Sequence, residues 1–170
     1  MKKILFAAIV LSGAAFNANA QAVASASATA TIVSPISISK TTDLNFGNIA
    51  VSTLAGGTVT LDPSAAATRT ASGGGGVTLP AVTGPIAAAL FAVTGQASFT
   101  YNITLPLSAT VVNGANSMTV DNFTSSIATG ALDGAGTQSF YVGADLTVAA
   151  AQAPGIYTTG TPFLVAVNYN

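Results

Sequence analysis

Residues 98–105 read SFTYNITL, in which the large side chains of Phe99, Tyr101, Ile103 and Leu105 alternate with Ser, Thr and Asn. Successive side chains of a strand point to opposite faces, so this period of two predicts a strand with one face in a core and the other in water. A strand cannot bury such a face alone, and a second layer must cover it. The stretch therefore predicts a central strand of a layered β protein.

Turn-forming residues punctuate the chain on both sides of this stretch. Asn113-Gly114 predicts a tight hairpin, and Pro162 predicts that the last alternating segment lies at a sheet edge or restarts there. Residues 65–76, rich in Ala, Thr, Ser and Gly, predict a flexible loop. We expect strands near residues 22–33, 36–39, 44–51, 57–61, 76–79, 89–94, 98–105, 117–123, 138–142, 145–148 and 156–169.

Short strands with turns at this spacing predict an all-β fold, an immunoglobulin-like antiparallel β-sandwich. An up-and-down barrel is the alternative. The sandwich is expected to be incomplete and completed by a donor strand if its first strand pairs outside its own domain.

The first twenty residues have the pattern of a signal peptide. Lys2 and Lys3 precede an apolar run, and Ala18-Asn19-Ala20 fits a cleavage site. Residues 21–170 then form one domain, which is expected to be exported, to cross the periplasm and to reach the cell surface or an extracellular fibre. No other apolar stretch approaches the roughly 20 residues that a spanning helix needs.

Charge is scarce in this chain. After residue 20, Lys40 and Arg69 stand against five aspartates, a net charge of −3. This excludes a nucleic-acid partner and an anionic membrane surface, both of which need clustered Lys and Arg. Only 5% of residues are charged, against roughly 25% in ordinary domains. Either assembly hides much of the surface, or Ser, Thr and Asn provide a neutral polar exterior.

The residue inventory argues against catalysis. His, Cys and Glu are absent, which removes the usual nucleophilic dyads and zinc sites. Asp62-Pro63 and Asp133-Gly134 are typical of turns, and the glycines at 73–76 lack the Lys-Ser/Thr of a phosphate loop. We therefore expect no enzyme activity, no catalytic residue, no cofactor and no metal. Without disulfides, stability must come from packing, sheet hydrogen bonds or neighbouring molecules.

Both ends of the exported chain alternate in the manner of strands. Residues 21–33 form a candidate donor strand, with Ala22, Ala24, Ala26, Ala28, Ala30 and Ile32 on one face. The last residues form a candidate assembly or chaperone-facing strand, with Phe163, Val165, Val167 and Tyr169 on one face. If the first strand pairs with the next copy, the protein is a polymer subunit.

Several segments resemble a bacterial secreted family known as a domain of unknown function, number 4402. They include residues 28–40, 43–49 (DLNFGNI), 57–63, 91–95, 100–106 (TYNITLP), 132–138 (LDGAGTQ) and the ending at 165–170. The resemblance covers essentially all of the chain after the signal peptide. It implies a fold more than an activity.

The two alternating termini and the stretch Gly155-Ile156-Tyr157-Thr158 are more loosely similar to chaperone–usher fimbrial pilins. That similarity implies an incomplete immunoglobulin-like sandwich whose N-terminal extension fills the groove of the adjacent subunit. It also implies copies of itself or related subunits as partners, together with a periplasmic chaperone and an outer-membrane usher.

The leading hypothesis is a structural subunit of a bacterial surface fibre, a fimbria or pilus, assembled by donor-strand exchange and contributing to adhesion or biofilm. The alternative is a self-complete secreted β-sandwich that contacts a glycan or host surface and does not polymerise. The two differ in where residues 22–32 pair.

Overall fold

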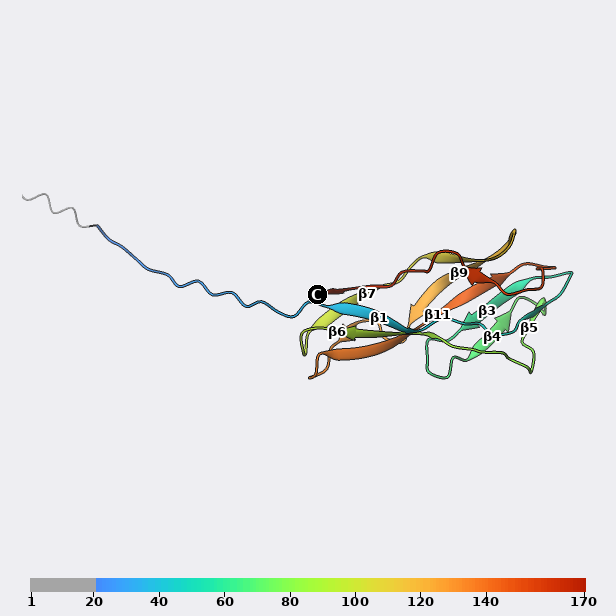
Figure 1. The fold of residues 1–170 in the computed structure, drawn as a ribbon, viewed down its shortest axis with the longest axis horizontal. Helices are drawn as coiled ribbons and strands as arrows, with labels where there is room; N and C mark the ends of the chain where they lie inside the picture. The colour runs from blue at the N-terminus through green and yellow to red at the C-terminus, as the bar shows by residue number, and fades with distance from the viewer. Residues whose placement is uncertain (1–20) are drawn as a thin grey trace, which may run out of the picture. The chain divides into compact units, whose positions relative to one another are not determined.

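The computed structural model describes residues 21–170, and the predicted signal peptide at 1–20 lies outside this range. The described chain contains strands and no helix, so no helix in it is long and apolar enough to cross a membrane. It divides into residues 21–32, called the extension below, and residues 33–170, called the domain. The strands of the domain (Figure 1) are β1 (Ser37–Thr42), β2 (Ala50–Val51), β3 (Gly57–Leu61), β4 (Arg69–Ser72), β5 (Val77–Thr78), β6 (Ala89–Thr94), β7 (Thr100–Thr104), β8 (Ser108–Asn113), β9 (Asn116–Ser125), β10 (Gly130–Ala131), β11 (Thr137–Val148), β12 (Thr158–Thr159) and β13 (Ala166–Tyr169).

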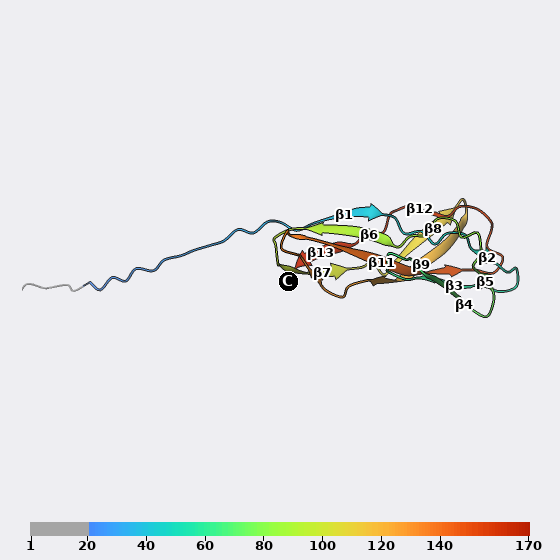
Figure 2. The same ribbon diagram turned by 90° about the horizontal axis from the view of Figure 1, so that it is seen from below.

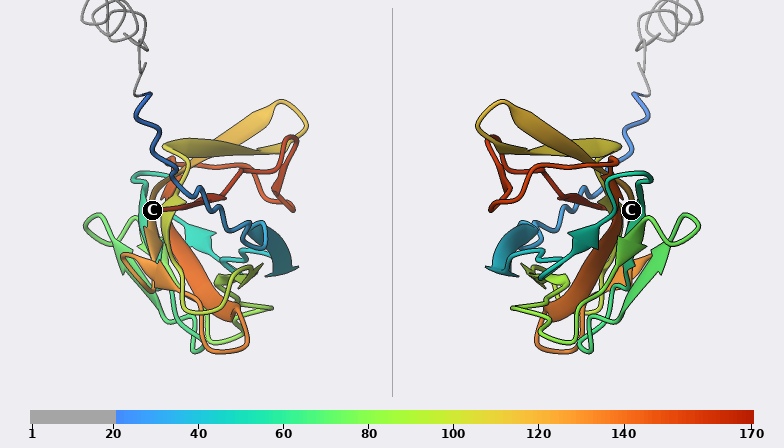
Figure 3. Two further views of the ribbon diagram at one scale, coloured as in Figure 1. Left: turned by 90° about the vertical axis from the view of Figure 1, so that its left-hand side faces the viewer. Right: turned by 90° about the vertical axis from the view of Figure 1, so that its right-hand side faces the viewer.

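The domain is an antiparallel β-sandwich, as the sequence predicts. The larger sheet has the order β1-β6-β11-β9-β8-β12, and β3 with β4 branches from β11. The smaller sheet has the order β10-β7-β13. β2 and β5 form a separate two-stranded sheet, and β5 contacts β3 and β4. In Figure 2, β7 and β13 lie alongside β6 and β11. Viewed end-on, the gold β8–β9 hairpin and the green β3–β4 pair lie on opposite sides of the domain (Figure 3). Both sheets remain open at their edges.

The long strand β11 forms the centre of the core. Its inward side chains are all buried, because alternate residues from Phe140 to Val148 are apolar: Phe140, Val142, Ala144, Leu146 and Val148. One edge of β11 pairs first with β6 and then with β3, and the other edge pairs with β9. From the smaller sheet, the fully buried Tyr101 joins the cluster around Phe140.

Most predicted strands are present with shifted limits. The hairpin at Asn113-Gly114 is confirmed, with Asn113 opposite Asn116, and β7 is the central strand of its sheet. The break before Pro162 is confirmed as well, since β12 and β13 are separate edge strands. The two strands expected at 138–142 and 145–148 are one continuous strand. The strand expected at 44–51 shrinks to a bridge at Asn45 and the short β2.

The prediction of a flexible loop over residues 65–76 was wrong for its middle part. Residues 69–72 form β4 and pair with β3. Arg69 explains the difference, because its guanidinium donates hydrogen bonds to the carbonyl oxygens of Phe46 and Asn48, the latter at 2.9 Å. The single arginine of the described chain therefore fastens β4 to the segment that follows β1.

Tyr101 occupies space that only a glycine leaves open. A Cβ added at Gly130 would lie 1.9 Å from the ring carbon Cζ of Tyr101. The Tyr101 hydroxyl donates a hydrogen bond to Oε1 of Gln138 at 2.8 Å, and the amide of Ala131 donates to the same oxygen at 2.8 Å. Burial raises the pKa of Tyr101. Gly130 thus lets β10 close over the largest side chain of the core.

Substituting Gly130→Ala is expected to destabilise the domain by at least the ~1–3 kcal/mol typical of overpacking, because Tyr101 must leave its place. Gly134→Ala is the matched control, since a Cβ there meets no atom within 4 Å. Denaturant unfolding of both variants measures the difference. Equal free energies of unfolding for the two variants would contradict the role of Gly130.

Candidate assembly edges

The extension forms no strand, and each of its residues is exposed. Ile32 is 97% exposed and Val23 is 85% exposed. The strand expected near residues 22–33 is therefore not formed by the isolated chain. The six residues predicted as one face of a donor strand are all in this state: Ala22, Ala24, Ala26, Ala28, Ala30 and Ile32. Their role as a donor stays a prediction.

The C-terminal strand forms one edge of the smaller sheet. Within residues 21–170, β13 pairs with β7 alone. Phe163, Val165, Val167 and Tyr169 are half-buried against the core cluster around Phe140, whereas the residues between them are exposed. Phe163 packs on Phe123 with the ring centroids 4.9 Å apart. The alternation predicted from the sequence is thus present, on a strand with one free side.

The first strand forms an edge of the larger sheet. In the described chain β1 pairs with β6 alone, and Ile36 and Ile38 are half-buried against the same core cluster as the C-terminal strand. This second edge was not predicted from the sequence. The alternation of Ile36 and Ile38 with Ser37 and Ser39 was the available signal, but it does not say which strand lies beside it.

The two free edges lie near each other without pairing. β1 and β13 approach to within 8 Å between Cα atoms, and no strand pairing joins them in the range 21–170. Because both strands cover one core cluster from different sheets, the sandwich is open along this side. The arrangement can accept a further strand by main-chain hydrogen bonding, the usual chemistry of an exposed sheet edge.

A second opening interrupts the pairing of residues 158–169 with strands β7 and β8. Residues 166–169 pair with β7, and residues 158–159 pair with β8, in one continuous register. Between these two paired stretches, residues 160–164 separate from residues 106–110 around a cavity of about 560 Å³, called the slit below. It is lined by Pro106, Ser108, Ala109, Thr110, Val112 and residues 160–164.

Two prolines explain the slit. The amide of Asn170 donates to the carbonyl oxygen of Thr100 at 3.3 Å, so every second pair from there is a hydrogen-bonded pair. Continuing the register of β7 with β13 places Pro106 opposite Leu164, and Pro162 opposite Ser108, at two such pairs. Each proline removes one ladder donor, so the ladder opens although its register is intact.

Replacing both prolines with threonine is expected to close the slit, because the missing N–H donors return. Hydrogen exchange should then show slower exchange of the amides of Ser108 and Leu164, with smaller effects in the single variants. Pro80→Thr, in the segment after β5, is the control for a general loss of proline rigidity. Unchanged protection at both amides in the double variant would contradict this account.

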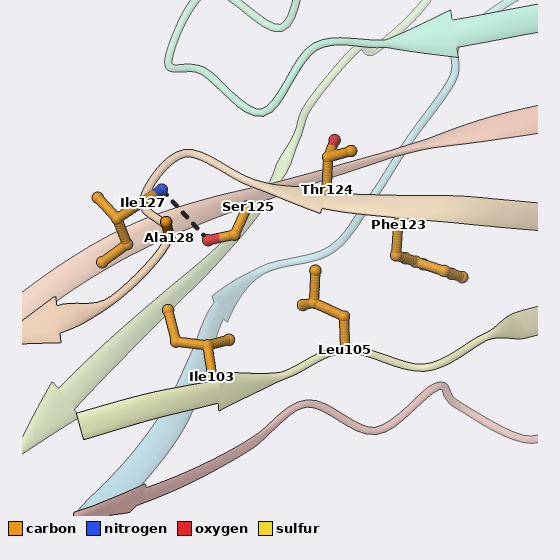
Figure 4. Close-up of a pocket in the computed structure, with 7 residues that line it drawn as sticks. All are labelled: Ile103, Leu105, Phe123, Thr124, Ser125, Ile127 and Ala128. Carbon is orange, nitrogen blue, oxygen red and sulfur yellow. Dashed lines mark hydrogen bonds between the residues drawn. The ribbon is translucent and has the colours of Figure 1, made fainter. Parts of the chain in front are cut away.

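A smaller apolar pocket lies on the other side of β7. It has a volume of about 300 Å³, and Figure 4 shows Ile103 and Leu105 reaching from the β7 side toward the segment that carries Phe123 and Ile127. None of its lining residues has a titratable side chain. The pocket therefore offers packing surface and no acid–base chemistry.

Asp133 and Asp43 both bond to residues close to them in the sequence. The carboxylate of Asp133 accepts hydrogen bonds from the amides of Thr137 at 2.8 Å and Ala135 at 2.9 Å, and from the Thr137 hydroxyl at 3.0 Å. These bonds, led by the Thr137 amide, lower the pKa of Asp133. Asp133 is thus the turn former that the sequence predicts. Asp43 pairs with Lys40 on the surface, and no three metal-ligating side chains gather in residues 21–170.

The lowered pKa of Asp133 predicts a pH dependence of stability. A carboxyl whose pKa is lower in the folded state stabilises the fold above its unfolded pKa and loses that contribution as the pH falls through the folded value. The stability lost in Asp133→Asn should therefore be largest at neutral pH and shrink below about pH 4. Urea unfolding across this range measures it, with Asp62→Asn as the control for loss of one charge. A loss that stays constant with pH would contradict the role of Asp133.

The family comparison agrees with the resemblance seen in the sequence. The family model described as domain of unknown function DUF4402 matches residues 36–169, so the chain belongs to this family. The match begins one residue before β1 and ends at the last residue of β13. No curated protein and no solved structure matches the chain significantly.

Proposed function

We propose that this protein is a structural subunit of a bacterial surface fibre, assembled by donor-strand exchange. In this proposal the extension of one copy pairs with the free edges of β1 and β13 in another copy. The subunit is exported, is held in transit by a periplasmic chaperone and an outer-membrane usher, and contributes to adhesion or biofilm as part of the fibre.

One observation carries the proposal. The strand at the C-terminus presents alternating half-buried side chains to a core that it shares with β1, yet its outer side has no strand partner within residues 21–170. The same chain carries an extended, alternating and exposed segment of eleven residues, 22–32. A free acceptor edge and a free donor segment in one molecule support pairing between copies.

The β13 edge lacks the usual protection of an edge strand. Natural edges are blunted by charged side chains, prolines or bulges. β1 has Lys40 and an irregular register next to it, whereas residues 163–169 contain neither a charge nor a proline. An edge left open in this way is suited to receive a strand.

Main-chain hydrogen bonds supply much of the proposed affinity. Each buried alanine methyl contributes only about 0.8 kcal/mol, so the five alanines of the extension contribute roughly 4 kcal/mol. Each main-chain hydrogen bond adds about 0.5–1.5 kcal/mol. Small side chains also limit the space that the acceptor must open, because the two edges already lie close together.

The proposal predicts that residues 21–170 polymerise and that deleting residues 21–31 prevents polymerisation while the domain stays folded. Light scattering after size-exclusion chromatography measures the mass of both proteins, and circular dichroism measures their fold. A full-length protein that remains a monomer, with the same thermal stability as the truncated protein, would support the self-complete binding domain instead.

A matched pair of substitutions tests the face of the donor strand. Ala26→Asp places a charge on the face that would enter the core, where an unpaired charge is costly. Ser27→Asp places the same charge on the opposite face. The proposal expects Ala26→Asp to block polymerisation and Ser27→Asp to leave it largely intact. Equal effects would point to a general influence of charge.

A further inference from the structure

The last tyrosine links three segments at one end of the open side. Its hydroxyl donates a hydrogen bond to the carbonyl oxygen of Ser34 at 2.9 Å and accepts one from the amide of Gln96 at 2.5 Å. The side chain of Gln96 accepts a hydrogen bond from the amide of Ser34 at 3.2 Å. These three bonds, called the clasp below, join the start of the domain, the β6–β7 turn and the end of β13.

The β6–β7 turn is shaped around this hydroxyl. A Cβ added at Gly95 would lie 2.2 Å from the hydroxyl oxygen of Tyr169. The ring of Tyr169 packs edge-on against Phe99, with the centroids 5.5 Å apart. The ring therefore has its own packing contact, and the hydroxyl adds the connection to Ser34 and Gln96.

The clasp holds together two edges that a donor strand must separate. Neighbouring strands lie about 4.8 Å apart, so a strand inserted between two others needs about 9.6 Å between them. β1 and β13 approach to within 8 Å. Insertion therefore requires the edges to move apart, and the bond from Tyr169 to Ser34 opposes that movement.

We propose that the clasp is a latch on the acceptor side, and that the Tyr169 hydroxyl must release Ser34 before a donor strand enters. This inference rests on the proposed function. The latch keeps the edges closed while no donor is present and limits the rate of strand capture. Tyr169 acts as a positioning residue, through the separation of the two edges.

The test uses the monomer fraction of residues 21–170, separated from polymer by size-exclusion chromatography. Fluorescence anisotropy follows the rate at which this monomer captures a fluorescent synthetic peptide of residues 21–33. Tyr169→Phe keeps the ring on Phe99 and removes both hydroxyl bonds. With about 1 kcal/mol for each bond, capture is expected to be roughly ten times faster or more. Gln96→Ala keeps the Gln96 amide and removes one bond to Ser34, so a smaller acceleration of about threefold is expected.

Tyr157→Phe is the matched control. The Tyr157 hydroxyl donates to the carbonyl oxygen of Ala153 at 2.8 Å and accepts from the side chain of Gln152 at 2.9 Å. The control therefore removes the same number of bonds away from Ser34 and Gln96, and it should leave the capture rate unchanged. Thermal unfolding of each variant checks for a general loss of stability, which would accelerate capture in the control as well.

The outcomes separate the latch from the proposed function. Faster capture in Tyr169→Phe and Gln96→Ala, but not in Tyr157→Phe, supports the latch. If the peptide binds and all variants capture it at one rate, or Tyr169→Phe captures it more slowly, the latch is wrong and strand exchange stands. If no variant binds the peptide, both are wrong. Should Tyr169→Phe fail to fold, Gln96→Ala alone decides between these outcomes.

Discussion

The length of β11 is the constraint on which the rest of the domain depends. Buried backbone amides and carbonyls need hydrogen-bond partners, and β11 is paired along both edges by β6, β3 and β9. In the larger sheet these three strands are followed outward by β1 beside β6, by β4 beside β3, and by β8 and β12 beyond β9. The smaller sheet has three strands and ends at β13, and the larger one ends at β1. The open side is therefore a consequence of where the first and last strands fall in the topology.

Strand positions could be predicted from the sequence, and neighbours could not. The alternation in residues 98–105 and 163–169 correctly placed most apolar side chains inward, because side-chain direction is a local property of a strand. Phe99 is the exception, since it precedes β7 and is 40% exposed. Pairing is decided by distant residues. Nothing near Arg69 shows that it reaches carbonyl groups more than twenty residues away, and nothing near Gly130 shows that Tyr101 lies over it. The slit likewise depends on two prolines that are distant in sequence and meet only through the register.

The low charge of the chain has a structural explanation that does not require assembly. On the outer face of the larger sheet, one row of cross-strand neighbours runs through Thr110, Thr119, Thr147, Thr58 and Ser72. Hydroxyl groups thus cover a face where many proteins place Lys and Glu. The neutral exterior considered in the sequence analysis is present on this face, so scarcity of charge supports polymerisation only weakly. The free edges of β1 and β13 give stronger support for polymerisation.

The residues around the start of the domain favour pairing between copies over pairing within one chain. For the extension to fold back, the chain would have to reverse before β1. Residues 21–34 contain no Gly, Asn, Asp or Pro, and Ser at 25, 27 and 34 is the one turn-favouring residue type among them. A reversal over residues 32–35 would also lack the closing amide, because residue 35 is proline. Pro35 in addition keeps Ser34 extended.

Both backbone polar groups of Ser34 are already bonded, to Gln96 and Tyr169. Pro35 fixes the backbone next to Ser34, and a reversal within residues 21–33 would have to form without Gly, Asn, Asp or Pro. Both features favour the proposed pairing of the extension with the edge of a second copy.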